Sequence, residues 1–303
     1  MSVVLIFLDA GPFLEEAIAS VVAQTFQQWE LLLVDDGSTD GSAEIARRWV
    51  AARPSRIRYL EHAGHGNLGM SAARNLGLEA AAAELVTFLD GDDVLRPEAI
   101  EALVSRLAAE PNAAMTYAPL EYWFSWDPDP ANRRRDFVQR LGVPTDAVVE
   151  PPELLVRFLG RSAAAPSGVM VRATVARQVG GFENAFRGMY EDQAFCAKIC
   201  LRWPVATVRY PGYRYRQHPG SSSAQADRSG RHEYGRGEFL RWLQHYLSSE
   251  GLGSGVVLST LQRELWWLER PRLQRLVRGF RRAGRRIMGV TRRIAAAARA
   301  QGR

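Results

Sequence analysis

The sequence predicts an α/β fold in which helices flank a mostly parallel sheet. In the first third of the chain, short apolar segments alternate with longer segments of helical periodicity. The apolar segments are hydrophobic throughout, which is typical of strands buried on both faces, and their alternation with helices is typical of parallel connections. With 303 residues, 47% of them hydrophobic, the chain can form one large domain or one domain with an appendage.

The elements of the first third follow from these two patterns. Continuously apolar runs predict strands at residues 3–8, 31–34, 57–60, 85–89 and 115–118. Helical spacing of apolar residues predicts helices at residues 13–24, 42–52, 71–83 and 97–109. A parallel sheet gathers the loops that follow its strands at one edge, so polar residues in those loops are the candidates for ligand binding.

The alternation stops after residue 118. Residues 119–150 contain tryptophans, prolines and an arginine run, and we interpret them as an insertion that either contacts a ligand or forms a structural flap. The chain then predicts a helix at 151–159, a strand at 168–171, a helix at 190–203 and a strand at 206–210. From residue 231 we expect only helices, with breaks near residues 251–255 and 271.

Composition narrows the functional classes. The net charge is +6, but residues 271–303 hold eleven arginines and no acidic residue, so the basic character belongs to the tail. Cys196 and Cys200 are four residues apart on an expected helix, which disfavours a disulfide, and two cysteines are too few for a zinc site. No segment approaches the roughly 20 apolar residues of a membrane span, and residues 3–8 lack the basic flank of a signal peptide. We therefore expect a cytoplasmic protein.

The strand at 85–89 ends in three carboxylates, those of Asp90, Asp92 and Asp93, with Gly91 between them. Carboxylates this close repel one another unless they are solvated or neutralised, and a hard divalent cation is a suitable partner. By itself the segment also fits an ordinary acidic turn. Its interpretation depends on the neighbouring loops.

Two of those loops carry further polar candidates. Asp35 and Asp36 follow the strand at 31–34 and lie too early to cap the next helix, so both are left for a ligand, whereas Asp40 or Ser42 suits the cap. Arg74 follows the next strand, in the first turns of the helix at 71–83. It could orient the acidic residues or contact a phosphate, and a purely structural Arg–Asp pair is the alternative.

Several spaced motifs in this order resemble the family 2 glycosyltransferases of the GT-A fold. They are FLEEAI from Phe13, QTF from Gln24, WEL from Trp29, VDDGSTDGS from Val34, SAARN from Ser71, FLDGDD from Phe88 and Pro97. The resemblance is dense over residues 3–118 and continues in pieces to about residue 218. It implies a nucleotide-diphosphate sugar donor, Mn²⁺ or Mg²⁺ held by a D-x-D motif, and inverting transfer to an acceptor.

The resemblance also implies roles for residues of the first half. Asp90-Gly91-Asp92 matches the D-x-D motif, with Asp92 as the metal ligand and Asp90 near ribose and metal, and Asp36 matches the acid that contacts the base. Ser38 and Arg74 join this nucleotide-sugar site, and Asp93 is interpreted as an acid beside the next helix. Where the family has an aromatic residue that stacks on the base, this chain has Leu8. Leu8 could still pack on the base, but uridine specificity is not implied.

The second half is similar to the family's acceptor side. Glu191-Asp192 matches an E-D motif, which makes Asp192 the expected general base and Glu191 the second choice. An acid pair that only complements the helix dipole is the alternative. In the segment Arg214–Ser221, Arg216 and His218 could neutralise the departing phosphates, and His218 could complete the metal shell, or it could be an ordinary surface histidine.

These inferences give a domain plan. Residues 1–225 form the GT-A domain, with a Rossmann-like nucleotide-sugar-binding half (1–118) and an acceptor half (119–225), and residues 226–303 form a helical extension. The arginines of residues 271–303 surround an apolar stripe, which suits an anionic membrane surface where lipid-linked acceptors are found. Nucleic acid is the weaker partner because the tail nearly lacks aromatic residues. The expected acceptor is a glycan or its lipid-linked precursor.

Two rival functions use the same features. A nucleotidyltransferase shares the sheet type and the carboxylate–metal chemistry, but residues 8–12 do not form the glycine-rich basic loop expected after its first strand. A catalytically silent nucleotide- or glycan-binding module would not need both acidic pairs.

Overall fold

The computed structural model describes residues 1–253, 255–271 and 273, and it contains two compact units, residues 1–243 and 244–303. The predicted domain boundary at residue 225 precedes this division, which falls within helix α9 (Arg231–Ser249). Apart from residues 271 and 273, the predicted basic tail helix lies outside the described residues. None of the helices in the described part is both long enough and apolar enough to span a bilayer.

Unit 1 is built on a mixed eight-stranded sheet in the order β3-β2-β1-β4-β10-β6-β11-β9. The strands are β1 (Ser2–Phe7), β2 (Glu30–Asp35), β3 (Ile57–Glu61), β4 (Leu85–Asp90), β6 (Met115–Tyr117), β9 (Val148–Val149), β10 (Met170–Arg172) and β11 (Val205–Thr207). Only β10 and β9 run antiparallel to their neighbours. The predicted mostly parallel sheet is therefore confirmed.

The helices follow the predicted alternation, and every element predicted within residues 1–118 is present with ends within three residues of the expected ones. They are α1 (Gly11–Val22), α2 (Ser42–Ala52), η1 (Ala63–His65), α3 (Met70–Ala80), α4 (Ala99–Ala109), α5 (Glu153–Leu159), α6 (Ala173–Gln178), α7 (Glu191–Cys200), α8 (Ser222–Ser229), α9, and in unit 2 α10 (Gly255–Leu268). The short helices α6 and α8 were not predicted. The expected helix break near residues 251–255 is present.

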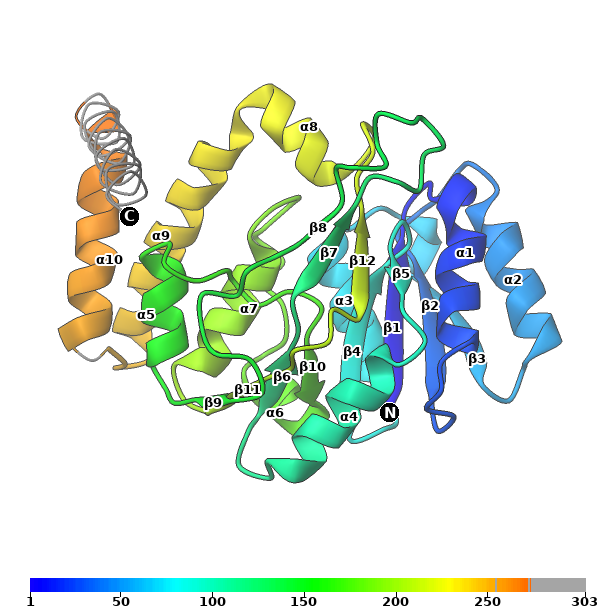
Figure 1. The fold of residues 1–303 in the computed structure, drawn as a ribbon, viewed down its shortest axis with the longest axis horizontal. Coiled ribbons are helices and arrows are strands. Elements are labelled where there is room, and N and C mark those ends of the chain that lie inside the picture. Colours follow the sequence, from blue (N-terminus) through cyan, green and yellow to red (C-terminus); the bar gives the residue numbers. More distant parts are fainter. Residues whose placement is uncertain (254, 272, 274–303) are drawn as a thin grey trace, which may run out of the picture. The chain divides into compact units, whose positions relative to one another are not determined.

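Helices cover both faces of the sheet because its central strands are apolar on both sides. Val3 and Leu5 of β1 belong to a core that also contains residues of α1 and α4, and Figure 1 shows these two helices in front of the strands. Val4 points to the other face, toward α3. There a Cβ on Gly77 would lie 2.2 Å from Val4 Cγ1, so the glycine allows α3 to pack closely on the sheet.

A second sheet in the order β5-β12-β7-β8 was not predicted. Its strands are β5 (Val94–Leu95), β7 (Leu120–Trp123), β8 (Phe137–Val138) and β12 (Tyr213–Arg216). Residues 119–150, predicted as an insertion, thus supply two strands to this sheet and β9 to the main sheet. Such short strands pair with residues far along the chain, as β7 does with β12, so the local pattern did not reveal them.

Candidate active site

Two clefts open at the carboxyl ends of β1 and β4 and meet there. The β1 cleft has a volume of about 540 Å³ and is lined by residues of β1, by Asp36, and by most residues of the segments 67–70, 90–92 and 218–225. The α7 cleft has a volume of about 300 Å³ and is lined by residues of β4, β7, β12 and the start of α7. Six residues line both clefts: Met70, Asp90, Gly188, Tyr215, Ser222 and Ser223. This is the edge of the sheet at which the sequence placed the ligand.

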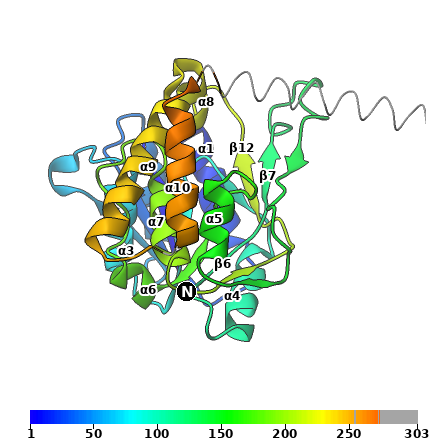
Figure 2. The ribbon, with the colours of Figure 1, turned by 90° about the vertical axis from the view of Figure 1, so that its left-hand side faces the viewer.

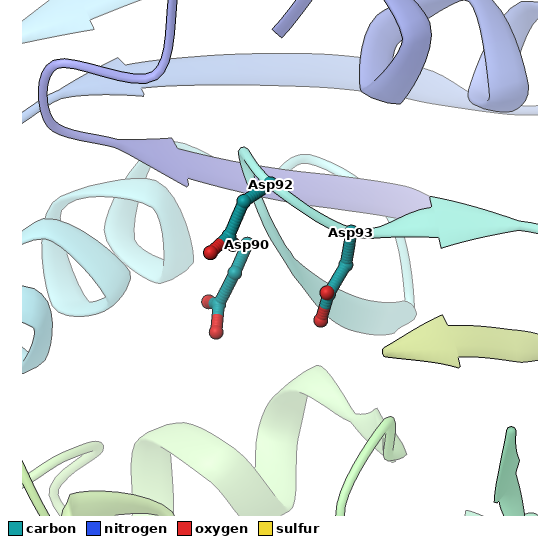
Figure 3. A group of neighbouring side chains, drawn as sticks. All are labelled: Asp90, Asp92 and Asp93. Atoms are coloured by element: carbon teal, nitrogen blue, oxygen red, sulfur yellow. The ribbon is translucent and has the colours of Figure 1, made fainter. Parts of the chain in front are cut away.

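The acidic loop after β4 is held against the end of β1. Gly91 N donates to Ile6 O at 2.9 Å, and a Cβ on Gly91 would lie 2.7 Å from Phe7 Cβ. Gly91 therefore contributes only backbone to the β1 cleft. Because it has no side chain, the loop can pack closely against the end of β1. Ligand atoms of Asp90, Asp92 and Asp93 lie within 4.8 Å of one another, and Figure 3 shows the three side chains extending from the loop in the same direction.

Repulsion between the carboxylates contributes to raised pKa values in this group. Burial and the negative charge of Asp92 raise the pKa of Asp93 well above its usual range. Burial also raises the pKa of Asp90, against the opposing effect of Arg74. A divalent cation would relieve this repulsion, and several carboxylate oxygens converging on one point are the donor set that Mn²⁺ and Mg²⁺ prefer. The residues therefore fit the implied metal.

The place of Asp93 corrects its expected role beside a helix. Asp93 is followed by β5, and α4 begins only at Ala99. One carboxylate oxygen of Asp93 accepts a hydrogen bond from Arg216 N at 2.9 Å. Asp93 belongs to the acidic group because β5 pairs with β12, a long-range contact that the sequence did not predict.

Arg74 links the acidic group to α7. Its guanidinium donates to Asp90 at 2.7 Å and to Glu191 at 2.9 Å, and the arginine side chain is only 8% exposed. Its Cζ lies 5.5 Å from the ring centroid of Phe182. The sequence left three roles open for Arg74: orienting the acidic residues, contacting a phosphate, or forming a purely structural pair. The geometry supports orientation of the acidic residues.

The two acids of α7 differ in their surroundings. Glu191 is buried, with one carboxylate oxygen on Arg74 and the other without a hydrogen-bond partner in the described part of the chain. Asp192 is half-buried and accepts a hydrogen bond from Gln193 N at 2.7 Å. Burial and the neighbouring Glu191 charge raise the pKa of Asp192 to about 7. Asp192 can therefore exchange a proton near neutral pH, whereas Glu191 is fixed by its ion pair.

The residue before α7 sets the direction of these acids. Tyr190 adopts a left-handed conformation with φ 70°, and its ring stacks on Phe239 with centroids 5.7 Å apart. The Tyr190 hydroxyl donates to His232 O at 3.3 Å. The start of α7 is therefore anchored by side-chain packing rather than by a capping residue.

The structure places Arg216 behind the acidic loop. The guanidinium donates to Asp92 O at 2.7 Å and to Glu16 at 2.6 Å. The residue is 3% exposed and is not among the side chains that line the two clefts. This corrects the expected phosphate contact, because its charge is already paired and its Cζ lies 4.6 Å from the ring centroid of Trp123. Arg216 positions the loop instead.

His218 does line the β1 cleft, and its Nε2 lies 3.0 Å from Asp92 Oδ2. Phe13 packs against the imidazole, with ring centroids 4.6 Å apart. His218 is thus directed at the acidic group and could offer it a nitrogen ligand.

The structure separates three residues of the predicted nucleotide-sugar site, Leu8, Asp36 and Ser38. Leu8, which is 44% exposed, and Asp36 line the β1 cleft. Asp36 also accepts hydrogen bonds from the backbone of Leu68 and Gly69. Ser38, by contrast, does not line either cleft, and its hydroxyl accepts a bond from Asp9 N at 3.0 Å.

The surroundings of Asp35, the last residue of β2, correct the prediction that both Asp35 and Asp36 are left for a ligand. It is fully buried, and its carboxylate accepts bonds from Ser38 N at 2.8 Å and from the Tyr59 hydroxyl at 2.8 Å. An aspartate that bonds the backbone three residues ahead forms a tight turn, and this local use was missed.

The sequence also missed the aromatic wall of the α7 cleft. Tyr122 of β7 and Tyr213 and Tyr215 of β12 line this cleft. The signal that could have revealed this wall is the alternation along β7, where Glu121 and Trp123 are buried and Leu120 and Tyr122 are only partly buried. Four residues are too few to distinguish such a strand from a loop by sequence.

Comparisons with known proteins agree with this geometry. The model of the family described as Glycosyl transferase family 2 matches residues 2–159. The uncharacterized protein y4gI of Sinorhizobium fredii is 30% identical over 277 residues, which cover 89% of this chain and 28% of that protein. The cholesterol galactosyltransferase of Borreliella burgdorferi is 34% identical over 110 residues, 36% of this chain and 30% of the relative. Glycosyltransferase GlyG of Streptococcus pneumoniae is 36% identical over 107 residues, 35% of each protein. The chain spans only 28–35% of the length of these relatives.

Solved structures share the fold. Residues 1–349 of S. aureus TarS superpose with a TM-score of 0.65 at 17% identity, covering 88% of this chain and 70% of that one, and TarS has also been crystallised with UDP and UDP-GlcNAc. The mannosyltransferase PcManGT of Pyrobaculum calidifontis, in complex with GDP-Man and Mn²⁺, gives a TM-score of 0.58 at 18% identity, covering 88% and 69%. At this identity the likeness shows the fold.

Proposed function

The chain belongs to glycosyltransferase family 2, and from that premise we propose that it moves a sugar from a nucleotide-diphosphate sugar to a glycan or lipid-linked acceptor, with inversion. The observation that carries the proposal is the pair of joined clefts, with the acidic loop where they meet and Asp192 in the α7 cleft. An inverting transfer needs a base on the face of the sugar opposite the leaving group. The two clefts offer separate places for donor and acceptor.

The donor would occupy the β1 cleft. Leu8 offers an apolar surface to the base, and Asp36 can accept a hydrogen bond from a base N–H. TarS binds UDP and UDP-GlcNAc, and PcManGT binds GDP-Man. These ligands support a nucleotide sugar of this general type as the donor.

Asp90, Asp92, Asp93 and His218 would hold Mn²⁺ or Mg²⁺. A divalent cation neutralises charge on a diphosphate leaving group and so makes its departure easier. Arg216 keeps the loop in place from behind, through its bond to the Asp92 carbonyl. Arg74 keeps Asp90 turned toward the same point.

Asp192 would take the proton of the attacking hydroxyl. The acceptor oxygen forms a bond to the anomeric carbon while the bond from that carbon to the diphosphate oxygen breaks, and its electron pair leaves with the diphosphate. A carboxylate with a pKa of about 7 is well matched to this transfer near neutral pH. Glu191 would orient Arg74 through their ion pair.

Substitution of the two acids tests these roles. Nucleotide sugars are first screened for thermal stabilisation of the protein with Mn²⁺ present, which identifies the donor. Asp192→Asn should then bind that donor normally and lose about 10²–10⁴-fold in transfer rate. Loss of donor binding in Asp192→Asn would indicate a structural role. An active Asp192→Asn together with an inactive Glu191→Gln would exchange the two assignments.

The cellular setting of the proposal rests on sequence. We infer that the enzyme works in the cytoplasm and that the arginine-rich residues 271–303 attach it to an anionic membrane surface. Attachment there would bring the clefts close to a lipid-linked acceptor.

A further inference from the structure

The second sheet carries a row of aromatic side chains. Adjacent strands β12, β7 and β8, which Figure 1 shows side by side, pair Tyr215 with Tyr122 and Tyr122 with Phe137. The rings of Tyr122 and Phe137 are stacked with centroids 4.6 Å apart, and the rings of Tyr122 and Tyr215 meet edge to face at 5.2 Å. Paired residues on neighbouring strands point to the same face, so the three rings form one continuous row.

The inner end of this row lies in the candidate active site. Tyr215 lines both clefts and Tyr122 lines the α7 cleft. Burial and the nearby Asp192 carboxylate raise the pKa of the Tyr122 hydroxyl. A molecule that reacts beside Asp192 would therefore contact Tyr122.

The outer end of the row is open to solvent. Phe137 lies on the edge strand β8 and is 51% exposed. One face of its ring is stacked on Tyr122, so the exposed part is available to another molecule. Its neighbour Val138 is 48% exposed but pairs with Glu121, which places it on the opposite face of the sheet. An exposed aromatic residue that continues a ligand cleft is typical of a binding surface rather than of the core.

The chemistry of the row and cleft favours an uncharged sugar chain. Four carboxylates line the α7 cleft, and its one arginine, Arg74, is already paired with Asp90 and Glu191. Within the described part of the chain, the cleft therefore offers an anionic acceptor no unpaired arginine or lysine. Pyranose rings have C–H faces that pack on aromatic rings and hydroxyls that bond to a tyrosine hydroxyl. Tyr122 and Phe137 lie on neighbouring strands, about 5 Å apart, which is close to the separation of successive pyranose rings in a sugar chain.

We propose that the row Tyr215–Tyr122–Phe137 is the binding surface for an uncharged oligosaccharide acceptor of at least two pyranose units. The reacting ring lies against Tyr122 beside Asp192, and the next ring stacks on the exposed face of Phe137. This inference rests on the proposed function and specifies its acceptor as a chain of neutral sugars.

The test compares Phe137→Ala with Val138→Ala, which removes an equally exposed side chain from the other face of the same strand. The probes are glucose, cellobiose and cellotriose, and the corresponding series that begin with galactose and lactose and with N-acetylglucosamine and chitobiose. Dissociation constants are measured by ligand-observed NMR titration with Mn²⁺ and the nucleotide of the stabilising donor. The thermal midpoints of both variants are measured to show that they fold equally well.

In at least one series the disaccharide should bind the wild-type protein about tenfold more tightly than the monosaccharide. Phe137→Ala should abolish this difference, Val138→Ala should keep it, and Tyr122→Phe should weaken both sugars. The inference is overturned if Phe137→Ala keeps the difference, or if no probe binds a protein that does bind a nucleotide sugar. Binding that depends on sugar length, in a protein that binds no nucleotide sugar, would support the surface and reject the proposed transferase.

Discussion

Replacing Arg74 by methionine should destabilise the protein strongly, because this arginine is the buried cation between Asp90 and Glu191. The arginine and Glu191 side chains are each 8% exposed, and their atoms are 2.9 Å apart. Methionine keeps much of the side-chain volume but removes the charge, which leaves a buried carboxylate unpaired. Breaking a buried ion pair from one side costs about 3–5 kcal/mol. We expect this loss in the free energy of unfolding at pH 8.

The pH dependence identifies the cause of this loss. Arg74 lowers the pKa of both Asp90 and Asp192, although both remain raised by burial, so its removal raises them further. A carboxyl whose pKa is higher in the folded than in the unfolded protein loses stabilisation as pH rises through the folded pKa. The loss of unfolding free energy in Arg74→Met relative to the wild-type protein should therefore be largest at pH 8 and become smaller toward pH 5.

Urea unfolding followed by tryptophan fluorescence measures the effect. The control is Arg157→Met, which breaks the exposed pair with Glu153 on α5 and should cost no more than about 0.5 kcal/mol. The double variant Arg74→Met/Glu191→Gln should recover part of the loss because the unpaired charge is gone. A loss equal to that of the control, or a deficit that grows as the pH falls, would refute the reasoning.

Four further outcomes are expected. The transfer rate should fall about tenfold for each pH unit below an apparent pKa near 7, because Asp192 must be ionised to act as the base. A transfer rate that does not change between pH 5 and pH 8 would contradict this role. Gly77→Ala should cost about 1–3 kcal/mol in urea unfolding by overpacking against Val4, whereas Gly255→Ala, with open space around its Cβ position, should be close to neutral. EDTA should abolish the thermal stabilisation of the protein by the donor, and added Mn²⁺ should restore it in the wild-type protein but not in Asp92→Asn. Stabilisation by the donor that survives EDTA would show that donor binding does not need a metal. The full chain should sediment with anionic vesicles more than a chain that ends at Glu269, and equal partitioning would reject membrane attachment by the tail.

Most of the fold of residues 1–118 could be predicted because its signals are local. Each apolar run and helical period in residues 1–118 lies within one element, and the polar residues after β1, β2 and β4 follow directly in the sequence. The second sheet could not be predicted in this way. Its strands have two to four residues each, and β7 pairs with β12 only after the chain has folded.

The sequence by itself determined that acidic residues gather at one edge of a parallel sheet, because strand direction and the position of each loop are local properties. The tertiary structure decided which of these residues remain available for chemistry. Arg74 and Glu191 are 117 residues apart, and their hydrogen bond engages Glu191 rather than the adjacent Asp192. Arg216 and Glu16 are 200 residues apart, and their contact withdraws Arg216 from the cleft. Charge pairing and desolvation depend on neighbours in space, so the roles of the individual acids and bases were decided only when the chain folded.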